Sequence, residues 1–330
     1  MADITTKYAG LILRNPIIVG SCGLTNSVED IKKLESSGAA AVVLKSIFEE
    51  EIQLDAKDSL YKAQKDNLLY ASHSETFDYI DQQTQKDSLE KYVKLIKDTK
   101  KQVYIPVIAS INCVTPYVWT DFAAKIQDAG ADAIELNIFI NPFDASKIST
   151  EETYAFIVKE VKLKISVPVT VKISNYLSRP VTVMNNLSSE GVDGIVLFNR
   201  FYQSDIDIQK EEVIDGNKFS NPEEYLTSLK WIAMLSGKIK TDFAASTGIY
   251  NGETLVKFLL AGAKAVQVVS VLYKNGFDQI NIMLSFLEKW MAEKGYGYID
   301  QFSGKLNKSH IANQASFERI QFMRYFSGIE

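Results

Sequence analysis

Four segments of the chain repeat one pattern of polar and apolar positions: the end of an amphipathic helix, a glycine, and then an almost unbroken apolar run. A glycine at such a point can take the left-handed conformation that ends a helix, because it has no Cβ to clash with the backbone. The apolar run that follows at once is typical of a buried strand. The four segments are SSGAAAVVLK (36–45, with Gly38), DAGADAIELN (128–137, with Gly130), SEGVDGIVLF (189–198, with Gly191) and LAGAKAVQVV (260–269, with Gly262).

Four more apolar runs alternate with these segments and are also predicted to be strands. Three of them begin at or just after a proline, which suits the start of a strand, where no backbone donor is required. They are NPIIVGS (15–21), IPVIAS (105–110), VPVTVKIS (167–174) and KTDFAAS (240–246). Helical patterns are expected at 27–38, 88–100, 117–129, 151–165, 180–190, 223–236, 252–261 and 277–294.

Eight alternating strand and helix patterns favour an α/β barrel. Near-continuous apolar strands indicate a sheet that is covered on both faces, and such sheets are parallel. An open Rossmann-type sheet is the alternative, but no G-x-G-x-x-G follows the first strand, where a dinucleotide-binding turn would lie. The pattern therefore predicts a (β/α)8 TIM barrel.

The whole chain, 1–330, is expected to form a single barrel domain, although its length would also allow two ordinary domains. Two connections are too long for simple turns, at about 47–87 and 200–222. Both follow a strand, so both are expected at the C-terminal face, where long loops act as lids or binding loops. Residues 295–330 are predicted to form a C-terminal extension.

Composition excludes several classes of function. Apolar residues make up 46% of the chain, charged residues 23%, and the net charge is −5, so no basic footprint for nucleic acid or an anionic membrane exists. No apolar run approaches the ~20 residues that span a bilayer, and the N-terminus lacks a signal-peptide pattern. Cys22 and Cys113 are far apart, and the chain has only two histidines, so neither a disulfide nor a metal site is indicated. A cytoplasmic soluble protein is expected.

Polar residues recur where the predicted strands end, which indicates a site at the barrel mouth. Glu135 and Asn137 are two apart, so both point to one face of their strand. Lys45 and Lys172 lie within otherwise apolar strands, and burying an ammonium is costly unless an anion or acceptor meets it. The lysines could pair with Glu135, or they could form a cationic wall for an anionic ligand. The other polar ends are Ser21, Ser46, Ser110, Asn112, Ser174, Asn199, Arg200, Ser246, Thr247, Gly248 and Ser270.

The ends of the last two strands suggest that the ligand carries a phosphate. AASTGIYNGETL (244–255) has small residues, a glycine and a helix that opens near Asn251, and QVVSVLYKNG (267–276) contains Ser270. Backbone N–H groups of these loops and a helix N-terminus form the usual phosphate cradle of a barrel. Small residues also serve plain turns, but together with the lysines they favour a phosphorylated cofactor.

These segments resemble the class 1 dihydroorotate dehydrogenases, which are FMN-dependent barrels. The resemblance rests on NPIIVGS, AVVLKS, IPVIASI, AIELN, VPVTVKIS, STGIYNG, LLAGAKAVQV and the late GYGYIDQFSGKL, and it covers nearly the whole chain. VLFNRFYQSDID (196–207) and SIFEEEI (46–52) are similar to an uncharacterised dihydroorotate dehydrogenase-like branch.

The resemblance implies a set of flavin contacts. Lys45, Asn137 and Lys172 would also serve catalysis, and a cation such as Lys172 at the flavin N1/O2 edge stabilises the negative charge of the reduced ring. Asn199 and Arg200 would contact substrate; alternatively, Arg200 pairs with Asp205 or Asp207. The expected cofactor-binding residues are Gly20, Ser21, Lys45, Ser46, Asn137, Lys172, Asn199, Thr247, Gly248, Val269, which stands in place of a family glycine, and Ser270.

One catalytic position departs from the family. The cysteine or serine that removes a substrate proton aligns with Ile140, and the following Pro-Asn is reversed to Asn141-Pro142. A surrogate base could come from His73, Cys113, Tyr176 or Tyr202, although each has a commoner structural interpretation: a solvated loop histidine, a buried thiol, or a packed tyrosine.

Three hypotheses follow. The first is an FMN-dependent oxidoreductase that converts (S)-dihydroorotate to orotate in pyrimidine biosynthesis, with an unknown electron acceptor. The second is an ene- or enone-type reductase that uses the same flavin, and the third is a non-catalytic FMN-binding protein. The resemblance also implies a homodimer, in which the IDQFSGKL segment and the 200–222 connection are candidate contacts.

Overall fold

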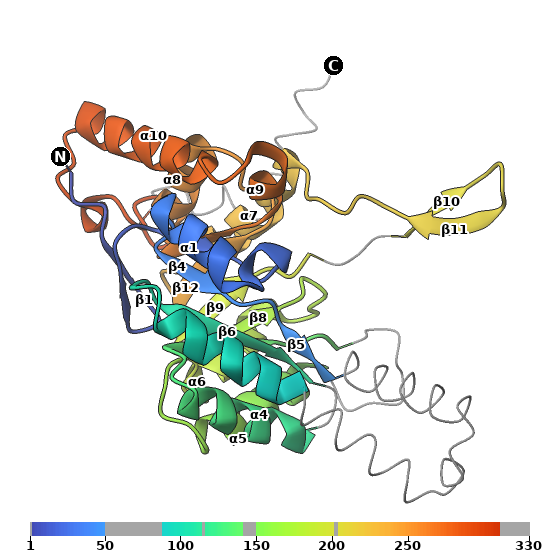
Figure 1. Ribbon diagram of the computed structural model, residues 1–330. Helices are drawn as coiled ribbons and strands as arrows, with labels where there is room; N and C mark the ends of the chain where they lie inside the picture. The colour runs from blue at the N-terminus through green and yellow to red at the C-terminus, as the bar shows by residue number, and fades with distance from the viewer. Residues whose placement is uncertain (1, 50–87, 114–115, 141–149, 201–203, 311–330) are drawn as a thin grey trace, which may run out of the picture.

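A closed barrel of eight parallel strands forms the centre of the protein (Figure 1). The computed structural model describes residues 2–49, 88–113, 116–140, 150–200 and 204–310. Neighbouring strands pair in the order β4-β3-β13-β12-β9-β8-β7-β6, and the pairing of β4 with β6 closes the ring. The strands are β3 (Ile17–Val19), β4 (Ala41–Val43), β6 (Val107–Asn112), β7 (Ala133–Asn137), β8 (Val169–Ile173), β9 (Gly194–Leu197), β12 (Asp242–Ser246) and β13 (Ala265–Val268).

Helices follow the strands and surround the barrel, so the predicted (β/α)8 fold is confirmed and the open Rossmann-type sheet is excluded. In Figure 1, α4, α5 and α6 lie on one side of the barrel, and α7, α8 and α10 lie on the other. The helices are α1 (Val28–Ser36), an unlabelled helix at 88–100, α4 (Pro116–Asp128), α5 (Thr150–Lys162), α6 (Pro180–Ser189), α7 (Tyr225–Leu235), α8 (Gly252–Ala261), the short α9 (Ser270–Asn275) and α10 (Gln279–Lys294).

The predicted helix ends are present. The four glycines of the repeat have left-handed φ values of 98° (Gly38), 95° (Gly130), 82° (Gly191) and 106° (Gly262). At the other end of α1, the Ser27 side chain accepts a hydrogen bond from the backbone N–H of Asp30, as a serine cap does.

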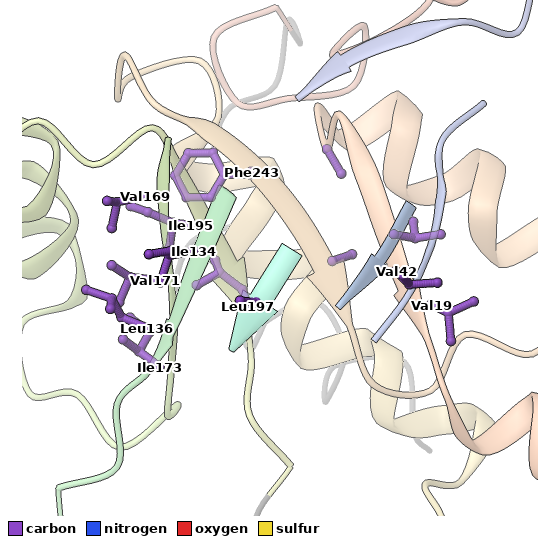
Figure 2. Close-up of a cluster of buried hydrophobic side chains, with 14 of the residues drawn as sticks. Val19, Val42, Ile134, Leu136, Val169, Val171, Ile173, Ile195, Leu197 and Phe243 are labelled. Carbon is purple, nitrogen blue, oxygen red and sulfur yellow. The ribbon is translucent and has the colours of Figure 1, made fainter. Parts of the chain in front are cut away.

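Side chains alternate strictly between the two faces of the barrel wall. The outward positions carry large apolar residues that pack under the helices, as Figure 2 shows for Ile134, Leu136, Val171, Leu197 and others. The inward positions near the N-terminal end carry a second apolar cluster, in which alanines such as Ala133, Ala244 and Ala265 lie beside Ile18 and Ile108. Toward the C-terminal ends the inward positions become polar, with Ser110, Glu135, Lys172 and Gln267 all buried.

An N-terminal hairpin, which the hydrophobic pattern did not predict, packs against the barrel. Its strands are β1 (Thr6–Tyr8) and β2 (Leu11–Leu13), paired antiparallel. Tyr8 is fully buried with the interior residues, and the N–H of Ala9 donates to the Asp242 carboxylate at 2.9 Å. TKY and LIL are runs of three residues each, too short to show a strand period in the sequence.

The 200–222 connection contains a second hairpin. Strands β10 (Ser204–Asp207) and β11 (Glu212–Asp215) pair antiparallel and project away from the barrel (Figure 1). Ile206, Ile208 and Val213 are 66%, 79% and 76% exposed. The hairpin therefore presents apolar side chains to solvent.

The other two predicted additions are only partly described. The 47–87 connection begins with β5 (Ile47–Phe48), which pairs with the end of β6, and its remainder beyond residue 49 lies outside the described residues. Residues 295–310 of the C-terminal extension pack on the barrel's helices: the N–H of Leu306 donates to the carbonyl of Leu260 at 2.8 Å, and Phe302 is fully buried. The single-domain organisation stays a prediction. No helix in the described ranges is long and apolar enough to cross a membrane.

We predict that Gly194→Ala destabilises the barrel. A Cβ at this buried position would lie 2.8 Å from the Tyr8 hydroxyl oxygen, and the surrounding ring is packed on all sides. Overpacking of this kind costs about 1–3 kcal/mol, so the thermal unfolding midpoint should fall. Gly297→Ala is the matched control, because its Cβ would approach only Gln301 Oε1, at 3.7 Å. Equal midpoints for the two variants would contradict the tight fit of Tyr8.

Candidate functional site

A cavity of about 360 Å³ opens at the C-terminal ends of the barrel strands. Pockets that hold small ligands or cofactors span about 300–1,000 Å³. Among the residues that line it are Lys45, Lys172, Arg200 and Lys218, and none of the described lining residues is an aspartate or glutamate. The wall is therefore cationic and suits an anionic ligand.

The structure brings together almost all of the predicted cofactor residues. Gly20 is the exception: it lies behind the wall, where a Cβ would approach Val269 Cγ2 at 3.0 Å and Gln267 Oε1 at 3.3 Å. Arg200 also lines the cavity. The predicted cofactor residues that line it are Ser21, Lys45, Ser46, Asn137, Lys172, Asn199, Thr247, Gly248, Val269 and Ser270.

Hydroxyl and amide side chains from five strand ends form a continuous network on one side of the cavity. Ser46 is its centre: its hydroxyl lies 3.1 Å from Ser21 Oγ and 2.7 Å from Ser110 Oγ, and it accepts from Asn137 Nδ2 at 3.3 Å. Asn199 Nδ2 donates to Asn137 Oδ1 at 2.6 Å. These bonds hold the two asparagines in one orientation, so that their remaining polar atoms can meet a ligand.

Lys172 is the buried cation of the cavity, at 8% exposure on β8. It makes no direct ion pair with Glu135, contrary to the pairing considered from the sequence. Gln267 on β13 lies between them: its Oε1 accepts from Lys172 Nζ at 2.9 Å, and its Nε2 donates to Glu135 Oε2 at 2.5 Å. Burial lowers the pKa of Lys172 and raises that of Glu135, and in both cases the charge of the other residue opposes the shift.

Gln267 was missed by the sequence analysis. The signal was present, because a glutamine in the run AVQVV is polar at an inward position of an otherwise apolar strand. Such a residue needs a buried partner, and the partner could not be named until β8 and β13 were placed across the same interior.

Lys45 differs from the prediction. It was expected inside an apolar strand, but β4 ends at Val43, and Lys45 lies two residues beyond at half-buried exposure. Its backbone N–H approaches the Thr25 carbonyl at 3.4 Å. Lys45 therefore stands at the rim of the cavity, where the cost of burying its charge is smaller than for Lys172.

The turns after β12 and β13 form the other end of the cavity. Thr247 and Gly248 have φ values of 78° and 73°, and a Cβ on Gly248 would collide with the backbone N–H of Tyr225 at the start of α7. Only glycine allows that approach. The expected contribution of the α8 N-terminus stays a prediction. Asn251 caps this helix by accepting from the N–H of Thr254 at 2.9 Å, and Asn251 does not line the cavity.

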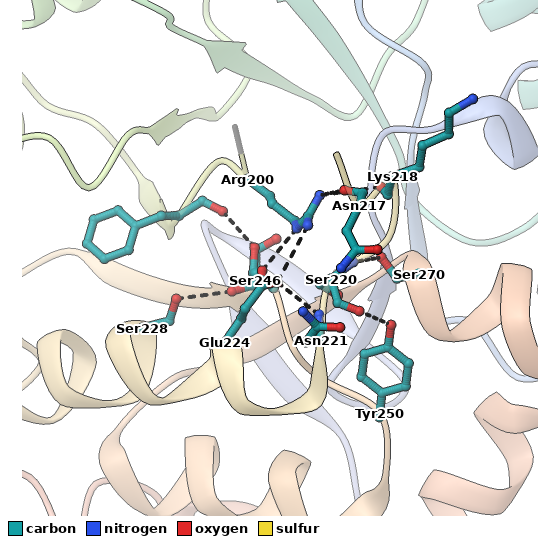
Figure 3. A network of polar contacts seen from close by, with 12 residues as sticks. Arg200, Asn217, Lys218, Ser220, Asn221, Glu224, Ser228, Ser246, Tyr250 and Ser270 are labelled. Carbon is teal, nitrogen blue, oxygen red and sulfur yellow. Dashed lines mark hydrogen bonds and ion pairs between the residues drawn. The ribbon is translucent and has the colours of Figure 1, made fainter. Parts of the chain in front are cut away.

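Arg200 ties the long connection after β9 to the start of α7 (Figure 3). Its Nε donates to Glu224 Oε2 at 2.9 Å, and its Nη1 donates to the carbonyl of Asn217 at 2.8 Å. The ion pair with Asp205 or Asp207 considered from the sequence is therefore wrong, since the partner is Glu224. A guanidinium held at two ends in this way positions the 217–220 segment beside the cavity.

Ser220 joins this segment to the turn after β13 (Figure 3). Its N–H donates to Ser270 Oγ at 3.0 Å, and its carbonyl accepts from the Tyr250 hydroxyl. Lys218 and Ser220 line the cavity but were not predicted to do so. They lie in a loop about twenty residues beyond the end of β9, and a loop carries no hydrophobic period that could place it over the barrel mouth.

A family model described as dihydroorotate dehydrogenase matches residues 3–291. The chain belongs to the dihydroorotate dehydrogenase family. It is similar to the dihydroorotate dehydrogenase B (NAD(+)) catalytic subunits of Thermoplasma volcanium and Thermoplasma acidophilum, each 27% identical over 92% of this chain and over 98% and 99% of the relative. A putative dihydroorotate dehydrogenase A (fumarate) of Aeropyrum pernix is 25% identical over 66% of this chain and 72% of the relative.

Membership of this family makes the protein an oxidoreductase that acts on CH–CH bonds. Members of the family generally use a flavin. The residues present fit an anionic flavin: the wall has cations without carboxylates, a buried lysine faces the cavity, and the tight turn at Gly248 leaves backbone groups at one end.

None of the proposed surrogate bases within the described residues lines the cavity. Ile140 is partly buried against the outer core and does not line the cavity, and neither do the buried Cys113 and the 58% exposed Tyr176. His73 and Tyr202 lie outside the described residues. Cys22, which was not proposed, does line the cavity, but burial raises the pKa of its thiol, which favours the protonated form that cannot accept a substrate proton.

We predict that Arg200→Ala loosens the 217–220 segment. The substitution removes the contacts to Glu224 and to two backbone carbonyls, and hydrogen bonds of a charged group contribute about 1.5–3 kcal/mol. The backbone N–H of Ser220 should exchange with deuterium faster, as followed by mass spectrometry. Lys218→Ala is the control, because its side chain makes only a 4.0 Å exposed contact with Asp215. Unchanged exchange in Arg200→Ala would show that Ser270 and Tyr250 suffice to hold the segment.

Proposed function

We propose that the protein binds FMN in the cavity at the barrel mouth and is an FMN-dependent oxidoreductase of the dihydroorotate dehydrogenase type. One observation carries the proposal. Polar residues from seven strand ends, expected from the sequence to contact a flavin, converge on a single cationic cavity without carboxylates in its described wall.

Each group of residues has a role in this proposal. Bound FMN would accept a hydride from the substrate and pass the electrons on. Lys172, held by Gln267, faces the region where negative charge would develop, and a preorganised cation stabilises such charge without reorganisation. Asn137 and Asn199, held by Ser46 and by each other, orient polar groups of the ring or the substrate. The turns at Thr247–Gly248 and Val269–Ser270 would hold the phosphate.

The nearest candidate reaction is the oxidation of (S)-dihydroorotate to orotate, a step of pyrimidine biosynthesis. The printed names of the relatives give NAD⁺ and fumarate as electron acceptors to test. An ene- or enone-type reductase is the second candidate, and Ile140 favours it, because a reductase of this kind does not need a base to remove a carbon-bound proton. A non-catalytic FMN-binding protein would keep the cavity and use neither reaction. A cytoplasmic location belongs to the proposal and rests on composition.

We predict that the purified protein is yellow and releases FMN on heating. The turns proposed to bind the phosphate lie at one end of the cavity and Lys172 lies in its wall, which suits a mononucleotide flavin. Mass spectrometry of the released ligand should give FMN in about equimolar amount. A protein that stays colourless after reconstitution, or that releases FAD, would contradict the proposed function.

We predict that the native protein reduces its flavin very slowly with dihydroorotate, and that Ile140→Cys does not restore reduction, because position 140 does not line the cavity. General base catalysis contributes about 10²–10⁴-fold, and Ile140 cannot supply it. Stopped-flow absorbance at the flavin band measures both proteins, with Ile140→Ala as the control for altered packing. Rapid reduction in the native protein would show that the base lies elsewhere. A gain in Ile140→Cys without a gain in Ile140→Ala would show that a thiol at position 140 reaches the bound substrate.

A homodimer is the third element of the proposal. The exposed Ile206, Ile208 and Val213 make the β10–β11 hairpin the preferred contact, whereas Ile299 and Phe302 of the C-terminal extension are buried within their own chain. We expect a dimer in sedimentation at micromolar concentration and a shift toward monomer in Ile206→Asp with Val213→Asp. Sedimentation of the native protein as a monomer would remove this element without affecting the flavin site.

A further inference from the structure

The barrel interior holds a buried carboxyl group directly behind the cavity. Glu135 on β7 is 1% exposed and does not line the cavity. Its connection to the cavity is the amide of Gln267, which bonds Glu135 Oε2 on one side and Lys172 Nζ on the other. Glu135 and Lys172 are therefore one buried acid–base pair with a single amide between them.

The other oxygen of this carboxyl group lies among further polar atoms that lack partners. Glu135 Oε1, Thr170 Oγ1 and Tyr8 Oη are all buried without a hydrogen-bond partner among the described residues. The sheet register brings them together: Glu135 pairs with Thr170, and Thr170 pairs with Gly194, whose Cα faces the Tyr8 hydroxyl. If Glu135 is ionised, its Oε2 accepts from Gln267 and its Oε1 has no hydrogen-bond donor among the described residues. If Glu135 is protonated on Oε1, that oxygen can donate to these hydroxyls.

The charges around Glu135 come from several elements. Lys172 on β8 favours the ionised form, and burial opposes it. Tyr8 on β1 and Tyr92 on helix 88–100 also face it, and burial raises the pKa of both phenols far enough to keep them neutral. Cys22 faces Lys172 and is held neutral by burial, and Asp242 at the start of β12 acts on Tyr8 from farther down the barrel. Glu135 is the carboxyl of this cluster that shares the Gln267 amide with Lys172.

We propose that Glu135 is a proton-accepting positioning residue for the flavin site, an inference that rests on the proposed function. With no negative charge beside Lys172, the pair is a carboxylate and an ammonium. When the substrate's electron pair brings negative charge next to Lys172, Glu135 takes one proton from solvent on its free oxygen. Lys172 stays an ammonium throughout, and the proton returns to solvent when the charge leaves.

The physical reason is charge compensation in a dry interior. A negative charge beside the pair attracts the ammonium and repels the carboxylate. Because burial already disfavours the charged form of the carboxyl, this repulsion favours its protonation. Protonation changes the pair from neutral to positive and balances the new charge. A purely structural Glu135 would keep its charge and serve only as a fixed counter-ion for Lys172.

The test counts protons during reduction of the bound flavin. Native protein and Glu135→Gln, both loaded with FMN, are photoreduced without oxygen in weak buffer that contains a pH indicator. We expect Glu135→Gln to take up about one proton fewer per flavin than the native protein at a pH where the native carboxyl is ionised. Asp242→Asn is the matched control, since it removes a partly buried interior carboxyl that does not line the cavity, and its count should equal the native one. Equal counts in native protein and Glu135→Gln overturn the inference.

A second measurement uses the native protein alone and decides the matter if Glu135→Gln does not fold. Infrared difference spectra of protein with ¹³C-labelled glutamate should show a carboxylic acid C=O stretch that appears on reduction and shifts with the label. The absence of that band in a protein whose flavin is reduced overturns the inference. Failure of the proposed function looks different: the native protein takes up no flavin, which removes both claims together.

Discussion

Closure of the sheet by the pairing of β4 with β6 is the constraint on which the rest of the structure depends. A closed parallel sheet gives every strand one face toward a narrow interior and one face toward helices. The outward positions can therefore carry Ile134, Val171 and Leu197, while Ala133 and Ala244 fill the interior. Because all the strands run in one direction, their carboxyl ends open at one mouth, and polar residues far apart in the chain share one cavity.

Desolvation sets the charges within that mouth. Lys172 is buried where an ammonium is costly. Its hydrogen-bond partner is Gln267, which in turn bonds Glu135, and no carboxylate of the described cavity wall takes that place. A carboxylate in direct contact would neutralise the lysine and repel an anionic ligand. With an amide between the two charges, the described wall stays cationic while the interior behind it remains balanced.

The rim of the cavity depends on a different kind of interaction. Arg200 follows β9 directly, so its position is determined by the barrel, and its guanidinium binds Glu224 together with the carbonyls of Asn217 and Lys218. Ser220 then meets Ser270 across the mouth. These bonds hold the loop against the turns proposed to bind the phosphate. The Arg200 side chain, which was expected to contact substrate, is therefore engaged in hydrogen bonds within the protein.

The sequence by itself determined the alternation of strands and helices and the polar positions that face the barrel interior. Glycines such as Gly38 and Gly262 end helices for a local steric reason, and alternation within AIELN and VTVKI assigns Glu135, Asn137 and Lys172 to one face; both effects act over a few residues and can be recognised in the chain. The tertiary structure alone decided which groups meet. Lys172 and Gln267 are 95 residues apart in the chain. Arg200 pairs with Glu224 rather than with the aspartates nearer in sequence, and Tyr8 of the N-terminal hairpin is buried inside the barrel. These outcomes depend on closure and desolvation, which no local pattern encodes.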